Sequence, residues 1–141
     1  MCGPQPPPSP PKPPTPTVTT HHLTVGATTA IPYPPTLAND TGFTSITEPA
    51  DQNTTTVVGS GDTMIWQISG DISGIVAITD DTANVNLFSS GPGPMNDGTG
   101  RWSGVIGNFP AGTTESYSIS YNVNGAPENP YTQDPKLSMK T

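Results

Sequence analysis

The chain has 141 residues and a formal net charge of −7, with only 11% charged residues but 19 prolines and 15 glycines. Its four Lys and Arg residues argue against nucleic-acid binding, which needs cations to neutralise phosphates. No apolar run approaches the about 20 residues that cross a bilayer, so no membrane span is predicted. A single cysteine, Cys2, excludes an intrachain disulfide and a Cys-based zinc site.

Residues 1–16 form a proline-rich arm, and nine of the fourteen residues from 3 to 16 are proline. Because the proline ring fixes φ, the arm favours polyproline II at about 3.1 Å per residue and reaches roughly 40 Å. A stiff arm loses less entropy than a Gly/Ser linker when it lies along a surface. We therefore expect the arm to make an ordered contact.

The stretch "TVTTHHLTV" (17–25) is β-branched, free of proline, and predicted to be a strand. Its alternation places His21, Leu23 and Val25 on one face and Thr20 and His22 on the other. Residues 31–37 contain a second proline cluster that should act as an extended hinge. The sequence therefore predicts an isolated strand over 17–30, which is either donated to a neighbour or folded back.

Residues 38–141 alternate short β-patterns with turn chemistry and show no helical period. Strands are predicted around residues 43–47, 54–58, 63–69, 74–79, 84–89, 101–107, 110–123 and 135–140, with a long loop at 90–100. A spacing of about 8–12 residues is typical of a sandwich. The predicted fold is an all-β, immunoglobulin-like antiparallel β-sandwich of about seven or eight strands.

Three segments carry a family resemblance: "GDTMIWQIS", "FPAGTTESYSISYNV" and a closing strand after Asp134-Pro135. They resemble immunoglobulin-like or cupredoxin-like sandwiches. They are also similar to the AidA/PixA inclusion-body family, which places a GD-x-x-x-W strand and a closing DP strand in this order. The resemblance implies the fold and no activity.

The sequence offers little catalytic or metal chemistry. Adjacent strand residues face opposite sides, so His21 and His22 are not expected to share a metal. The acidic or turn clusters at Asp62, 80–81 and 96–98 lack the spacing of a calcium loop. There is no G-x-S-x-G motif. We therefore expect no enzyme activity, no metal site and no cofactor.

Sugar attachment is predicted in two regions. The sequons begin at Asn39 and Asn53. The arm has the Pro/Ser/Thr composition of O-glycosylated stalks, with Ser9, Thr15 and Thr17 as candidate sites. Covalent glycans would keep such an arm extended.

Aromatic residues raise the alternative of a carbohydrate-binding platform. Trp66 alternates with other apolar residues and is expected in the core, whereas Trp102, beside Arg101, is the best exposed candidate. Tyr33 and Tyr131 are weaker candidates. An alternative function is therefore a secreted carbohydrate-binding or adhesive module with a proline-rich linker, and a third is a surface lipoprotein attached through Cys2.

The arm, the isolated strand and the hinge together favour self-assembly. A strand held apart from its own sheet can pair with an open sheet edge on a neighbour, and a head-to-tail contact that does not close builds a filament. This organisation resembles the polymerising β-sandwich subunits of extracellular, in some cases glycosylated, helical fibrils. We expect an extracellular or cell-surface homopolymer, with the assembly residues Pro6, Pro7, Pro8, Pro10, Pro11, Pro13, Pro14, Val18, Thr20, His22, Leu23 and Val25.

Overall fold

The computed structural model describes residues 3–4, 6–7, 18–39, 44–45, 55–80 and 86–140. Over these ranges the chain forms eleven strands and no helix, so none of them contains a helix that could cross a membrane. The strands are β1 (Thr20–Ala27), β2 (Thr36–Asn39), β3 (Thr44–Ser45), β4 (Thr55–Val58), β5 (Thr63–Gly70), β6 (Ile72–Asp80), β7 (Phe88–Pro94), β8 (Trp102–Ile106), β9 (Thr114–Val123), β10 (Tyr131–Gln133) and β11 (Lys136–Met139).

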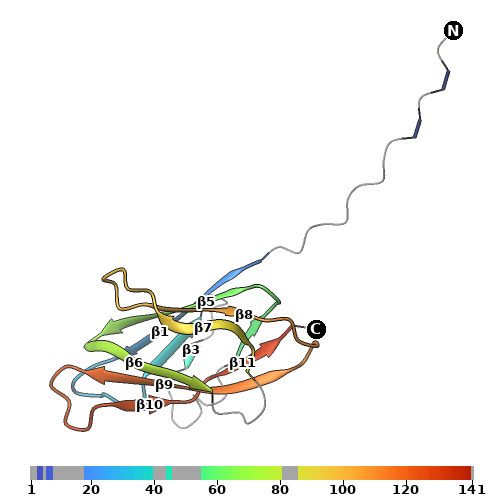
Figure 1. The fold of residues 1–141 in the computed structure, drawn as a ribbon. Helices are drawn as coiled ribbons and strands as arrows, with labels where there is room; N and C mark the ends of the chain where they lie inside the picture. The colour runs from blue at the N-terminus through green and yellow to red at the C-terminus, as the bar shows by residue number, and fades with distance from the viewer. Residues whose placement is uncertain are drawn as a thin grey trace.

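The strands form two sheets (Figure 1). The first has the order β3-β2-β1-β5-β8-β7. In the second, β9 pairs with β6 on one side and with β10 and β11 on the other, and β4 pairs with β11. The prediction of an all-β sandwich is confirmed. The sheets are mixed rather than antiparallel throughout, because β1 runs parallel to β5 and β11 runs parallel to β4.

The inward-facing residues of both sheets form one core. Trp66 of β5 is fully buried at its centre, as its alternation predicts, and its ring lies edge-on to Tyr117 of β9, with 5.8 Å between the ring centroids. The indole Nε1 of Trp66 donates a hydrogen bond to Tyr117 Oη over 3.2 Å. Burial raises the pKa of the Tyr117 phenol far above its ordinary value, so this hydroxyl stays protonated.

The first strand lies inside the sheet of its own chain, which corrects the prediction of an isolated strand and agrees with the alternative that the strand folds back. β1 pairs with β2 on one side and with β5 on the other. Leu23 and Val25 are fully buried in the core. The sequence predicted correctly which residues of β1 share a face, because side chains alternate between the two faces of any strand. The prolines of the hinge did not prevent the chain from turning back, so the sandwich begins near Thr20 rather than residue 38.

Several segments differ from their predicted structure, and one of them is β10, since no strand is predicted over 131–133. Part of the predicted hinge is strand β2, whose residues 36–39 pair with β1. Part of the predicted 90–100 loop is the second half of β7, which contains Pro92 and Pro94. Among the described strands, β7 pairs only with β8, and this ladder shows register shifts, so the prolines of β7 lie where a missing N–H donor costs little.

Candidate functional site

The chain enters the sandwich at Thr19, and a buried carboxylate fixes this entry point. Asp62 Oδ1 accepts a hydrogen bond from the Thr19 amide over 2.9 Å. Asp62 Oδ2 accepts from His21 Nε2 over 2.8 Å and from the Gly59 amide over 2.7 Å. The Thr63 amide donates in turn to the Thr19 carbonyl over 3.0 Å. We call this end of the molecule the arm end.

Burial by itself raises the pKa of the Asp62 carboxyl, because it disfavours the charged form. The hydrogen bonds from His21, Thr19 and Gly59 outweigh this effect, and the net pKa lies below its ordinary value. Asp62 is therefore ionised at neutral pH. Each of these bonds has a charged acceptor, which makes it stronger than a bond between neutral groups.

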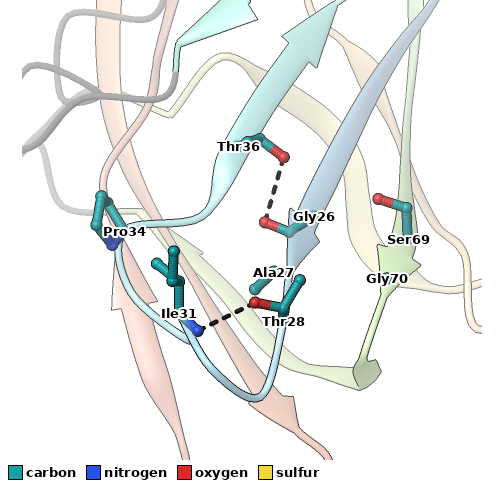
Figure 2. A pocket seen from close by; sticks show the side chains of 8 residues that line it. All are labelled: Gly26, Ala27, Thr28, Ile31, Pro34, Thr36, Ser69 and Gly70. Carbon is teal, nitrogen blue, oxygen red and sulfur yellow. Dashed lines mark hydrogen bonds between the residues drawn. The ribbon is translucent and has the colours of Figure 1, made fainter.

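An open pocket of about 480 Å³ lies where β1 and β5 end, and we call this the pocket end. Figure 2 shows it between the last residues of β1 and β5, the start of β2 and the loop 28–35. The apolar side chains of Ile31 and Pro34 come from that loop, and Ile31 is 62% exposed. The residues that line the pocket are Gly26, Ala27, Thr28, Ile31, Pro34, Thr36, Ser69 and Gly70.

Two glycines allow the groups that line the pocket to approach one another closely. Gly26 lies opposite Thr36 on one side and Ser69 on the other. A Cβ on Gly26 would lie 2.5 Å from Ser69 Oγ and 2.7 Å from Thr36 Oγ1, so a side chain would push both hydroxyls aside. Gly70 has φ +66°, and a Cβ there would collide with the Ala27 carbonyl oxygen.

The loop that forms one wall of the pocket is tied to both sheets. Thr29 donates from its amide to Asp71 Oδ2 over 2.9 Å and from its hydroxyl to the Asn124 carbonyl over 2.6 Å. The Tyr121 hydroxyl of the second sheet donates to the Pro32 carbonyl over 2.8 Å. These bonds hold Ile31 and Pro34 in place, so the pocket is formed before anything enters it.

The two ends of the molecule are one strand length apart. β1 runs from the arm end to the pocket end over eight residues, or roughly 26 Å at about 3.3 Å per residue. Thr19 and the pocket therefore lie at opposite ends of the same strand. A segment that continues β1 backwards leads away from the pocket of its own chain.

The predicted assembly residues fall into three groups. Pro6 and Pro7 are described and exposed, whereas Pro8, Pro10, Pro11, Pro13 and Pro14 lie outside the described residues. Val18 is 63% exposed and Thr20 is exposed, while His22 is half-buried. Leu23 and Val25 belong to the core of their own domain.

The predicted glycosylation sites receive little structural support. Asn39 is only 6% exposed, and its Nδ2 lies 3.5 Å from Thr56 Oγ1. A glycan on that amide does not fit the folded domain, because Asn39 faces the space between the sheets. Asn53, Ser9, Thr15 and Thr17 lie outside the described residues.

The aromatic residues proposed as a ligand platform are in part packed against the rest of the domain. Trp102 is half-buried and packs against the core. Arg101 is held beside it by Asp97, whose Oδ2 lies 3.1 Å from Arg101 Nη2. Tyr131 stacks on Tyr121 with 6.0 Å between the ring centroids. The four aromatic candidates therefore do not form one exposed face.

No metal centre is found in the part of the chain that the structure describes: no three His, Cys, Asp or Glu residues there lie close enough to hold an ion. His21 faces Asp62 inside the domain, while His22 lies on the outer face of β1.

Comparisons with known proteins add nothing about function. A scan against protein-family models finds no matching family, and a search of curated proteins finds no matching relative. Among solved structures, the chain is similar to the cysteine protease inhibitor EhICP2 from Entamoeba histolytica, at 14% sequence identity over 89% of this chain and 100% of that one. The TM-score of 0.35 is too low to support an argument about fold or activity.

Sequence reasoning missed the pocket. The one available signal was Gly26, a glycine inside an otherwise β-branched strand, since such a glycine marks a bulge or a close approach. The lining residues come from two segments, 26–36 and 69–70, and facing residues such as Gly26 and Ser69 are more than 40 positions apart in the sequence, so no local pattern joins them.

Proposed function

We propose that this chain is the structural subunit of an extracellular filament and assembles head-to-tail with identical subunits through its N-terminal arm. The observation that carries the proposal is the fixed entry of the chain at Thr19. Asp62 and the Thr63 amide hold both polar backbone groups of that residue. The chain that precedes Thr19 therefore leaves the domain at one defined end.

The contact is assigned to the arm rather than to strand β1. Both edges of β1 are already paired within its own chain. Its withdrawal would expose Leu23 and Val25 and leave the backbone groups of β2 and β5 unpaired, which is costly. Of the arm, residues 1–16, the structure describes 3–4 and 6–7, and these four residues are exposed rather than part of the core, so a contact of the arm with a neighbour need not disrupt the sandwich.

A contact of this kind is directional. The arm leaves from one end, so the surface that receives it on the next copy is a different surface. Such heterologous contacts repeat into an open filament unless the rotation closes a ring. The low charge and the Thr-, Asn- and Pro-rich composition support an extracellular location.

Electron microscopy of the full chain tests the proposal. We expect filaments from the intact chain and only monomers from a chain that lacks residues 1–17. A matched control keeps the length of the arm but replaces its prolines with serine. This control should assemble less well, because a flexible arm loses more entropy on docking. Full-length filaments from the truncated chain would refute the proposal.

A second variant separates arm docking from exchange of β1. Thr24 and Gln67 lie opposite each other on β1 and β5, with Gln67 Nε2 2.8 Å from Thr24 Oγ1. Thr24→Cys with Gln67→Cys, in a Cys2→Ser background, would form a disulfide that locks β1 into its own sheet. The oxidised, locked chain should still assemble. If it assembles only after reduction, β1 itself is exchanged between copies and the arm is not the connecting element.

A further inference from the structure

We propose that the pocket at the end of β1 and β5 is the acceptor for the proline-rich arm of a second copy of this chain. This inference rests on the proposed filament function and names the surface that receives the arm. The occupant is the segment 3–17, and the pocket residues that meet it are Gly26, Ile31, Pro34, Ser69 and Gly70.

The shape and chemistry of the pocket fit a proline-rich segment. Ile31 and Pro34 offer apolar surface on one wall, and the hydroxyls of Ser69 and Thr36 lie close over Gly26 (Figure 2). A polyproline II segment presents apolar rings and has few N–H groups, while its carbonyls remain open acceptors. Ser69 is an exposed residue that lines the pocket, and its hydroxyl can donate to such a carbonyl.

The pocket is also prepared for binding. The loop 28–35 is held by bonds from Thr29 to Asp71 and Asn124, and from Tyr121 to Pro32. A stiff arm that enters a preformed pocket loses little conformational freedom on either side. Ile31 is nevertheless 62% exposed, so a large apolar side chain stands uncovered at the rim.

The length of the arm and the point where it leaves favour a second copy over the same chain. The arm reaches roughly 40 Å in polyproline II, whereas the domain is roughly 26 Å long along β1. A neighbour aligned with the arm end would place its pocket end within that reach. To enter the pocket of its own chain, the arm would have to reverse direction next to Thr19, whose backbone is fixed on both sides.

Charge favours the same pairing. Lys12 is the only charged side chain in residues 3–17, and all 11 carboxylates of the chain lie C-terminal to the arm. Asp71 lies beside the pocket, where its carboxylate holds Thr29. A cationic arm attracts an acidic domain, whereas two arms repel each other and so do two domains. Charge therefore favours an arm-to-domain contact over arm-to-arm or domain-to-domain contacts.

The test uses full-length variants and measures the critical concentration for assembly by sedimentation and electron microscopy. Ile31→Ser removes the apolar rim, and Ser69→Tyr fills the mouth of the pocket. Each should raise the critical concentration about tenfold, the effect expected at an interface anchor. The matched control is Val76→Ser, which removes an exposed apolar side chain from β6, away from the pocket; it should change assembly less than twofold. Equal urea midpoints for all three variants would show that folding is intact.

A binding measurement separates failure of the pocket from failure of the filament. A synthetic peptide of residues 3–17 is titrated into the full chain below its assembly concentration while backbone amide shifts are followed by NMR. We expect the largest shifts at Gly26, Ile31, Ser69 and Gly70. If wild-type filaments form but Ile31→Ser and Ser69→Tyr assemble normally, the pocket is not the acceptor, although the filament proposal stands. Peptide shifts confined to other residues, or no shifts at all, would likewise overturn the pocket assignment.

Discussion

Leu23→Ala tests whether β1 belongs to the core of its own domain. Leu23 is fully buried and lies opposite Trp66 in the parallel ladder with β5. Truncation to alanine removes three carbon atoms from the core and leaves a cavity that neighbouring side chains fill only in part. Fully buried Leu→Ala changes cost about 3 kcal/mol of unfolding free energy, with a range of about 2–5 kcal/mol.

That loss is large for a small domain, whose unfolding free energy is typically about 5–15 kcal/mol. With a urea m-value of about 1.5 kcal/mol/M, it lowers the unfolding midpoint by about 2 M. Because the lost contacts lie within one chain, the shift should not depend on protein concentration. A strand supplied by a neighbour would instead make stability rise with concentration.

The measurement is urea unfolding of dilute monomer, followed by tryptophan fluorescence over a hundredfold range of protein concentration. Val18→Ala is the matched control, since Val18 is 63% exposed and its truncation should shift the free energy by less than about 0.5 kcal/mol. If Leu23→Ala costs less than about 1 kcal/mol, β1 is not packed in the monomer. A concentration-dependent midpoint would refute the same reasoning.

Three further predictions concern single sites. Because the pKa of Asp62 is lowered in the folded state, the ionised carboxylate stabilises the domain above about pH 4, and this stabilisation is lost as the pH falls through the folded-state pKa. Asp62→Asn should therefore destabilise the domain at pH 7 and make its acid unfolding less steep. An equally steep acid transition in the variant would contradict this. Tyr117→Phe should lower the free energy of unfolding in urea by about 1–3 kcal/mol, because it leaves the buried Trp66 indole N–H without its acceptor. An unchanged midpoint would show that another acceptor replaces the Tyr117 hydroxyl. Gly70→Ala should lower the unfolding free energy by at least about 1–2 kcal/mol, because Gly70 has a positive φ. Gly74→Ala is the control: the new Cβ meets nothing within 4 Å, so thermal melts should show almost no change. Similar losses of stability at both sites would refute the conformational argument.

The sequence predicted the local structure of the strands well. The alternation of Met64 and Trp66 with more polar neighbours placed β5 and its buried face correctly. The facing of His21 and Leu23 on β1 is right for the same reason. In each case one face of a strand meets the core and the other meets solvent, so a period of two in the residues carries the information.

Errors arose where distant pairing overrode local signals. The prolines of residues 31–37 predict a hinge that separates the first strand from the sandwich. Instead, the loop 28–35 turns the chain back, so that β2 pairs with β1 in an antiparallel register. The burial of Asn39 depends on the same strand pairing, and the presence of a sequon does not indicate whether its asparagine is buried. Proline limits the backbone locally, but it does not say which strand the chain meets afterwards.

By itself, the sequence determined an all-β domain and its strand faces, because these follow from residue type and spacing along the chain, and it predicts a stiff proline-rich arm. Only the tertiary structure decided that β1 lies between β2 and β5, that Asp62 fixes the entry of the chain, and that a pocket opens at the far end of the same strand. These features join residues about 40 positions apart, such as His21 with Asp62 and Gly26 with Ser69. Their contact depends on the order of strands in the sheet, which no local periodicity specifies.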